Sequence, residues 1–198
     1  LLSDKSINSD IKNKILTDRI SFINTAETEV YKCLYPLDLS NHVFLFTGLV
    51  NNISFTKEFI KFLNSRNATI IFSIGTGCEI HLNQFKNLKN VFITNIDKYK
   101  KYSKKQQLIN ERKSFHLFQW IKLDCAFEKL KLVEKNRNKR FKYVHKLRVD
   151  MIYLQPHLLF SKEYIELLNN DLNLISQGDL SFSTARDTFD KFNGIANF

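Results

Sequence analysis

The stretch Thr69-Ile70-Ile71-Phe72-Ser73-Ile74 is a nearly continuous apolar run that leads directly into the turn residues Gly75-Thr76-Gly77. Such a run is typical of a strand buried on both faces, as in a parallel sheet. The pattern recurs on either side of it, in residues 42–46 and 90–95, and an amphipathic segment at 56–66 separates the first two runs. Buried strands that alternate with helical segments predict an α/β fold with a mainly parallel central sheet flanked by helices.

The remaining segments extend this pattern over a single domain of residues 1–198. Residues 1–30 are expected to form a helical N-terminal extension, and residues 40–192 the core. The spacing of apolar residues predicts a helix at 3–24, a long helix at 114–135, a strand at 143–153, a helix at 161–169, a strand at 172–175 and a loop that leads into a helix at 179–192.

The composition excludes several classes of protein. The chain of 198 residues is 43% hydrophobic and 13% aromatic, with 5 Gly and 2 Pro, which argues against disordered, collagen-like and Pro-rich chains. No apolar run reaches the length of a membrane span. The 3 cysteines have no C-x-x-C spacing, so neither a disulfide framework nor a zinc site is indicated, and a reducing compartment is expected. The chain begins at Leu1, which leaves open that it is an excised piece of a longer protein.

The positive charge is concentrated in one stretch. The net charge is +10, and residues 100–148 hold 16 Lys and Arg against 4 Asp and Glu, whereas the rest of the chain holds 14 against 16. A basic stretch attracts anionic partners, namely nucleic acid, an acidic membrane surface or phosphorylated substrates. A solvated surface rich in lysine is an equally open interpretation.

Polar side chains gather where the predicted strands end. Thr47 and Gly48 close the first strand, Ser73 lies near the end of the second, and the fourth carries Arg148 and Asp150. Ligands of open α/β sheets bind outside the carboxyl ends of the strands. Two residues apart, Arg148 and Asp150 share one face of a strand and suit a site that holds phosphates together with a cation or a hydroxyl. A plain ion pair is the alternative.

Other motifs point to no chemistry. Gly75-Thr76-Gly77 lacks the spacing of the dinucleotide and P-loop phosphate-binding motifs, so a tight turn is expected there. The 5 histidines show no metal-ligand spacing, and Ser181 and Ser183 lie in no G-x-S-x-G motif.

The order of three segments resembles a known family. Residues 71–73 with Glu79, residues 105–107 before a long helix, and residues 143–150 are similar to the WavE-type glycosyltransferases of lipopolysaccharide and capsule synthesis. The family's Lys-x-Arg-x-Asp signature is matched by Lys146, Arg148 and Asp150, and a later segment by residues 177–183. The resemblance covers residues 42–192. It implies a GT-A-like fold and transfer of a sugar from a nucleotide-sugar donor to a surface-polysaccharide or glycolipid acceptor.

The expected site follows from the resemblance and from the chemistry of a departing diphosphate. The candidate catalytic residues are Asp150, Asp179 and Asp187. The candidate substrate-binding residues are Thr47, Gly48, Ser73, Lys146, Arg148 and Arg186. Asp150 is also the candidate ligand for Mn or Mg, although Arg148 stands where the first carboxylate of the usual Asp-x-Asp metal motif would be, which favours weak or absent metal dependence. The expected location is cytoplasmic, peripheral to the inner face of the membrane.

Two other functions stay open at this point. One is a nucleic-acid-binding module that uses residues 100–148, although the aromatic residues there have the spacing of a helix core rather than of a stacking platform. The other is a catalytically inactive domain that serves assembly, because the first Asp of the metal motif is absent.

Overall fold

A computed structural model describes residues 38–48, 56–75, 78–98, 102–103, 106–107, 117–149, 159, 161–170, 174–177 and 181–192. The predicted helix at 3–24, the candidate residues Asp150 and Asp179, and most of the first half of the basic stretch lie outside these ranges.

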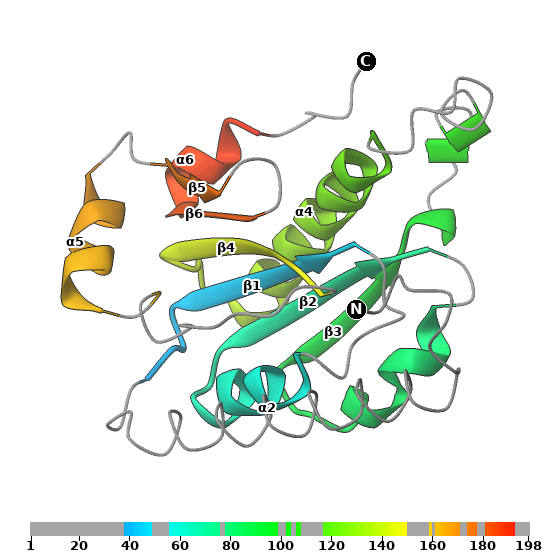
Figure 1. The fold of residues 1–198 in the computed structure, drawn as a ribbon, viewed down its shortest axis with the longest axis horizontal. Helices are drawn as coiled ribbons and strands as arrows, with labels where there is room; N and C mark the ends of the chain where they lie inside the picture. The colour runs from blue at the N-terminus through cyan, green and yellow to red at the C-terminus, as the bar shows by residue number, and fades with distance from the viewer. Residues whose placement is uncertain are drawn as a thin grey trace, which may run out of the picture.

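The described residues form an α/β structure around one six-stranded sheet (Figure 1). The strands are β1 (His42–Thr47), β2 (Thr69–Ile74), β3 (Val91–Asn95), β4 (Tyr143–Arg148), β5 (Leu174–Gln177) and β6 (Ser181–Ala185). The helices are α2 (Lys57–Ser65), α4 (Phe118–Arg137), α5 (Lys162–Asn169) and α6 (Arg186–Asp190), with 3-10 turns η2 (Glu79–Phe85) and η3 (Ile96–Lys98).

The sheet has the order β3-β2-β1-β4-β6-β5. Strands β3, β2, β1 and β4 pair in parallel, and β6 pairs antiparallel with both of its neighbours, so that it alone runs in the reverse direction. The predicted α/β class with a mainly parallel sheet flanked by helices is therefore confirmed.

Helices cover both faces of the sheet. Phe44, Phe46 and Phe72 point to the face on which α2 packs. The alternate residues Val43 and Leu45 point to the opposite face, where they pack against α4. This alternation explains why the central strands are apolar throughout, since each strand contributes side chains to two cores.

Helix α4 is the main support of its face. Its residues 121–127 are all buried, because the sheet covers one side and Tyr102 packs on Ile121 and Cys125 on another. The Tyr102 hydroxyl donates a hydrogen bond of 2.6 Å to Asp124. Beyond Val133, residues 135–140 are exposed. The helix therefore has a buried first half and an exposed, basic end.

Three predicted elements need correction. The strand expected at 143–153 ends at Arg148, and Val149 already lies in a turn. The strand expected at 172–175 is β5 at Leu174–Gln177. The loop expected before the last helix is strand β6, Ser181–Ala185, because its small polar residues pair with both β4 and β5.

Candidate functional site

A row of polar residues crosses the sheet at the carboxyl ends of its parallel strands. Thr47 of β1 is the register partner of Arg148 of β4, and Ser73 of β2 is the partner of Thr94 of β3. Phe46 of β1 pairs with Phe72 of β2, and extending this register by one residue places Thr47 beside Ser73. Because side chains alternate along a strand, all four residues of this row face α4.

The hydroxyl groups of this row are deeply buried. Thr47 and Ser73 have exposed fractions of 1% and 0%, and within the described ranges neither hydroxyl oxygen has a hydrogen-bond partner. A buried hydroxyl without a partner costs about 1–3 kcal/mol. Two such groups in adjacent strands are unusual in an apolar core and suit a place where polarity serves binding.

Lys122 reaches this row from α4. It is 9% exposed, and its Nζ donates a hydrogen bond of 2.7 Å to the carbonyl oxygen of Gly48, the residue that follows β1. Gly48 has a φ of 112°, a backbone conformation that favours glycine, and this turns the chain out of the sheet. Lys122 was not among the predicted residues, because a single lysine in a long basic stretch carries no distinguishing signal.

Two further cations come from β4. Lys146 is 1% exposed and lies between Leu45 of β1 and Phe182 of β6. Arg148 is partly exposed at the end of the strand. Both share the face of Val144, which packs in the core under α4. With Lys122, they place three cations at the carboxyl ends of β1 and β4.

This location is the topological switch point of the sheet. From β1 the chain proceeds to β2 and β3 on one side, then crosses over to β4 on the other. In doubly wound sheets the crevice at such a reversal is where nucleotides bind. Cations, hydroxyls and a glycine turn at this point suit an anionic ligand such as a diphosphate. Of the predicted residues, the structure brings Thr47, Gly48, Ser73, Lys146 and Arg148 together here.

The predicted carboxylates are not described at this edge. Asp150 and Asp179 lie outside the described residues. The residues that flank Asp179 along the chain, Gln177 and Ser181, are register partners, and Ser181 is adjacent to Phe182, the partner of Lys146. Among the described residues, no group of three His, Cys, Asp or Glu side chains could hold a metal ion.

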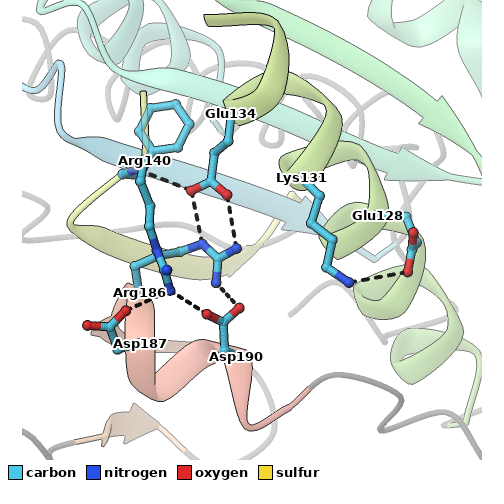
Figure 2. Close-up of polar contacts among 8 residues, drawn as sticks. Glu128, Lys131, Glu134, Arg140, Arg186, Asp187 and Asp190 are labelled. Atoms are coloured by element: carbon cyan, nitrogen blue, oxygen red, sulfur yellow. Dashed lines mark hydrogen bonds and ion pairs between the residues drawn. The ribbon is translucent and has the colours of Figure 1, made fainter. Parts of the chain in front are cut away.

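Arg186 and Asp187 lie at the end of the sheet opposite to Arg148, so the structure does not bring these two predicted residues together with the polar row. The pairing of Tyr143 with Ala185 puts both residues beside the start of β4, whereas Arg148 ends that strand. Arg186 is 5% exposed and grips both carboxylate oxygens of Glu134 at 3.0 Å (Figure 2). It also pairs with Asp190.

Asp187 is 89% exposed at this end and pairs with Arg140 at 2.6 Å. The sequence did not show that Arg186 and Asp187 lie far from Arg148. Their position follows from the antiparallel direction of β6, which ends at the amino edge of the sheet. Arg186 and Asp187 thus lie apart from Thr47, Ser73 and Arg148.

A buried histidine pair was also missed by sequence analysis. Nδ1 of His42 and Nε2 of His145 are 2.9 Å apart, and Nδ1 of His145 lies 2.8 Å from the Ser183 hydroxyl. Burial lowers the pKa of His42 to about 4 and lowers the pKa of His145 well below its usual value. The hydrogen-bonded side chains of His42, His145 and Ser183 lie on the α2 face of the sheet, where His145 stacks on Phe44. They are therefore separate from the polar row, which faces α4.

No family model, curated protein or solved structure matches this chain. Among the described residues, no helix is both long enough and apolar enough to cross a membrane.

Proposed function

We propose that the chain is a nucleotide-sugar-dependent glycosyltransferase with a GT-A-like fold, which moves a sugar to a surface-polysaccharide or glycolipid acceptor. The observation that carries the proposal is the group of three cations, Lys122, Lys146 and Arg148, at the switch point between β1 and β4. The resemblance to the Lys-x-Arg-x-Asp signature also implies that two of these residues, Lys146 and Arg148, bind the donor.

Glycosyl transfer from a nucleotide sugar needs positive charge near the diphosphate. Transfer of a glycosyl unit releases a nucleoside diphosphate, so negative charge grows on the phosphate oxygens in the transition state. Arg148 can donate two parallel hydrogen bonds to those oxygens. Lys122 and Lys146 are buried from water, where a fixed positive charge stabilises a developing anion more strongly than it would in solvent.

In this proposal carboxylates bind and activate the acceptor. An acceptor hydroxyl needs a general base within hydrogen-bond reach, and we assign this role to Asp179. In this proposal Asp150 holds the sugar or the acceptor. A divalent ion, Mn or Mg, would supply further charge on the diphosphate if Asp150 bound one.

The test is calorimetric titration of the full chain with uridine, guanosine and cytidine diphosphates. We expect binding to one of them, and we expect Arg148→Gln to weaken it by about 10- to 100-fold, the loss of a charge-assisted contact of 1.5–3 kcal/mol. Arg140→Gln is the matched control, because it removes the same charge at the opposite end of the sheet, where Arg140 is 54% exposed.

Two results would overturn the proposal. The first is an absence of nucleotide diphosphate binding with manganese and with chelator alike. The second is an equal loss of affinity in Arg148→Gln and Arg140→Gln, which would mean that net charge and not this site attracts the nucleotide. Tight oligonucleotide binding with a steep salt dependence would instead favour the nucleic-acid module.

A further inference from the structure

The basic stretch of the sequence is divided in space by helix α4. The helix has 20 residues, and its rise of 1.5 Å per residue makes it about 30 Å long. Lys122 lies at the carboxyl edge of the sheet beside Gly48, whereas Arg137 lies at the amino edge, where its Nη1 donates to the Thr69 hydroxyl at 2.7 Å. The cations of 100–148 therefore form more than one surface, and those of residues 135–142 belong to an end of the molecule that the proposed donor site does not use.

The amino-edge surface is basic and exposed. Residues 135–142 contain five cations and no acid. Seven of these eight residues are exposed, the exception being Phe141. The cations are Lys135, Arg137, Lys139, Arg140 and Lys142. We call residues 131–142 the basic end of α4.

The acids near this end are already engaged. Glu134 is held by Arg186, and Asp187 and Asp190 are held by Arg140 and Arg186, as Figure 2 shows. Hydrogen bonds from Ser40 and Asn67 lower the pKa of the Asp38 carboxyl. The positive charge of Lys139 lowers this pKa further.

Lys131 pairs with Glu128 at 3.7 Å, so the lysines that this end offers to an external partner are the exposed Lys135, Lys139 and Lys142. In the part of the chain that the structure describes, the Lys135 side chain makes no hydrogen bond or ion pair.

An apolar side chain lies within this surface. Leu132 is 50% exposed on α4, one turn before Lys135 and beside Lys131, which is itself 41% exposed in side-chain terms. A leucine between lysines suits a surface that meets both headgroups and the upper part of the acyl chains. A nucleic-acid surface would instead offer aromatic side chains for stacking, and residues 131–142 expose none.

We propose that the basic end of α4 docks on the anionic phospholipid headgroups of a membrane surface, with Leu132 in contact with the lipid. Residues Lys135, Lys139 and Lys142 supply the charge. Docking in this way holds the carboxyl edge, with Lys122, about 22 Å farther out along the helix, because 15 residues separate Lys122 from Arg137. The proposal stands on this surface alone and does not depend on the donor site.

The test is sedimentation of the full chain with vesicles of phosphatidylcholine alone and with vesicles that contain phosphatidylglycerol. We expect binding only to the acidic vesicles, with loss of binding as salt screens the charge. Each lysine near an anionic membrane contributes about a fivefold change in affinity, so Lys135→Gln with Lys139→Gln should weaken binding roughly 25-fold. Leu132→Ser should weaken it by a further few-fold at constant charge.

A matched control separates this surface from net charge. Lys61→Gln with Lys162→Gln removes the same number of charges from exposed lysines of α2 and α5, outside residues 131–142. We expect this control to bind acidic vesicles within about twofold of the wild type. The proposal is overturned by equal binding to neutral and acidic vesicles, or by equal losses in the two double variants. It is also overturned if Lys135→Gln with Lys139→Gln abolishes oligonucleotide binding and leaves vesicle binding unchanged.

Discussion

The buried pair of His42 and His145 should make the stability of this protein depend steeply on pH. Each neutral imidazole has one donor and one acceptor nitrogen, so one ring can donate to the other across the 2.9 Å between them. A first proton can be shared within the pair at the cost of placing a charge in the core. A second proton would set two N–H groups against each other, and the pair could not persist.

The size of the effect follows from the pKa of His42. Burial lowers this pKa from 6.5 in the unfolded chain to about 4 in the folded protein, with Asp38 raising it and Lys142 lowering it. The folded state therefore binds fewer protons between these two values, and stability falls as pH falls. Full protonation removes about 3.4 kcal/mol at 1.36 kcal/mol per unit, of which about 2 kcal/mol is already lost near pH 5. His145, whose pKa is lowered by burial and by His42, adds to the loss in the same direction.

Urea unfolding measured at about pH 7.5 and about pH 5, with tryptophan fluorescence as the signal, gives the two free energies. We expect the wild type to lose at least about 2 kcal/mol between them. The double variant His42→Gln with His145→Gln should lose much less, because no imidazole remains at the pair. The exposed His81→Gln is the control, and it should keep the wild-type slope.

The pair could prove essential for folding, in which case the double variant would give no transition. Proton NMR of the wild-type histidines then decides, since one imidazole should stay neutral down to about pH 4. A free energy of unfolding that is flat above pH 5, or a histidine set that titrates entirely near pH 6.5, would refute the reasoning.

Three further outcomes are expected. Arg186→Met should lower the free energy of unfolding by about 3–5 kcal/mol, because it leaves Glu134 buried without its main partner, and a loss below about 1 kcal/mol in urea unfolding would contradict this. Asp150→Asn should abolish donor turnover and change the melting temperature only slightly; a destabilised variant that still binds nucleotide would indicate a plain ion pair with Arg148. Chelation should weaken nucleotide diphosphate binding by less than about tenfold, because a divalent ion beside Arg148 meets like-charge repulsion of about 4 kcal/mol per unit charge at 4 Å, and a larger loss measured by calorimetry would contradict this inference.

The strands that could be predicted from sequence are those buried on both faces. β2 was predicted with its observed bounds, since a run of apolar residues between turn residues has few other interpretations. β6 was missed because Ser181-Phe182-Ser183-Thr184-Ala185 has no such run. Its strand conformation depends on pairing with β5 and with β4, which is distant in the sequence. Tertiary pairing, not local propensity, decides this segment.

The site could be predicted only in part, for a similar reason. Thr47 and Arg148 were found because both end strands, and parallel strands end at one edge. Lys122 could not be found, because its partner Gly48 lies 74 residues earlier in the chain. The same holds for His42 and His145, which are 103 residues apart. Contacts between residues so far apart in the sequence leave no spacing pattern from which they could be predicted.

The two arginines of the predicted site show what the fold adds to the sequence. Arg148 and Arg186 were both predicted to contact phosphate, and each has a carboxylate nearby in the sequence. In the structure, Arg186 directs Nε and both terminal nitrogens to Glu134 and Asp190 and stacks over Phe127. To bind a diphosphate it would have to break an ion pair that is buried, at a cost of several kcal/mol. Arg148 is partly exposed at the switch point, beside Thr47 at the end of β1. A donor diphosphate is therefore expected at the end of β4 that carries Arg148, and the opposite end of the sheet is left to hold α6 and to meet other partners.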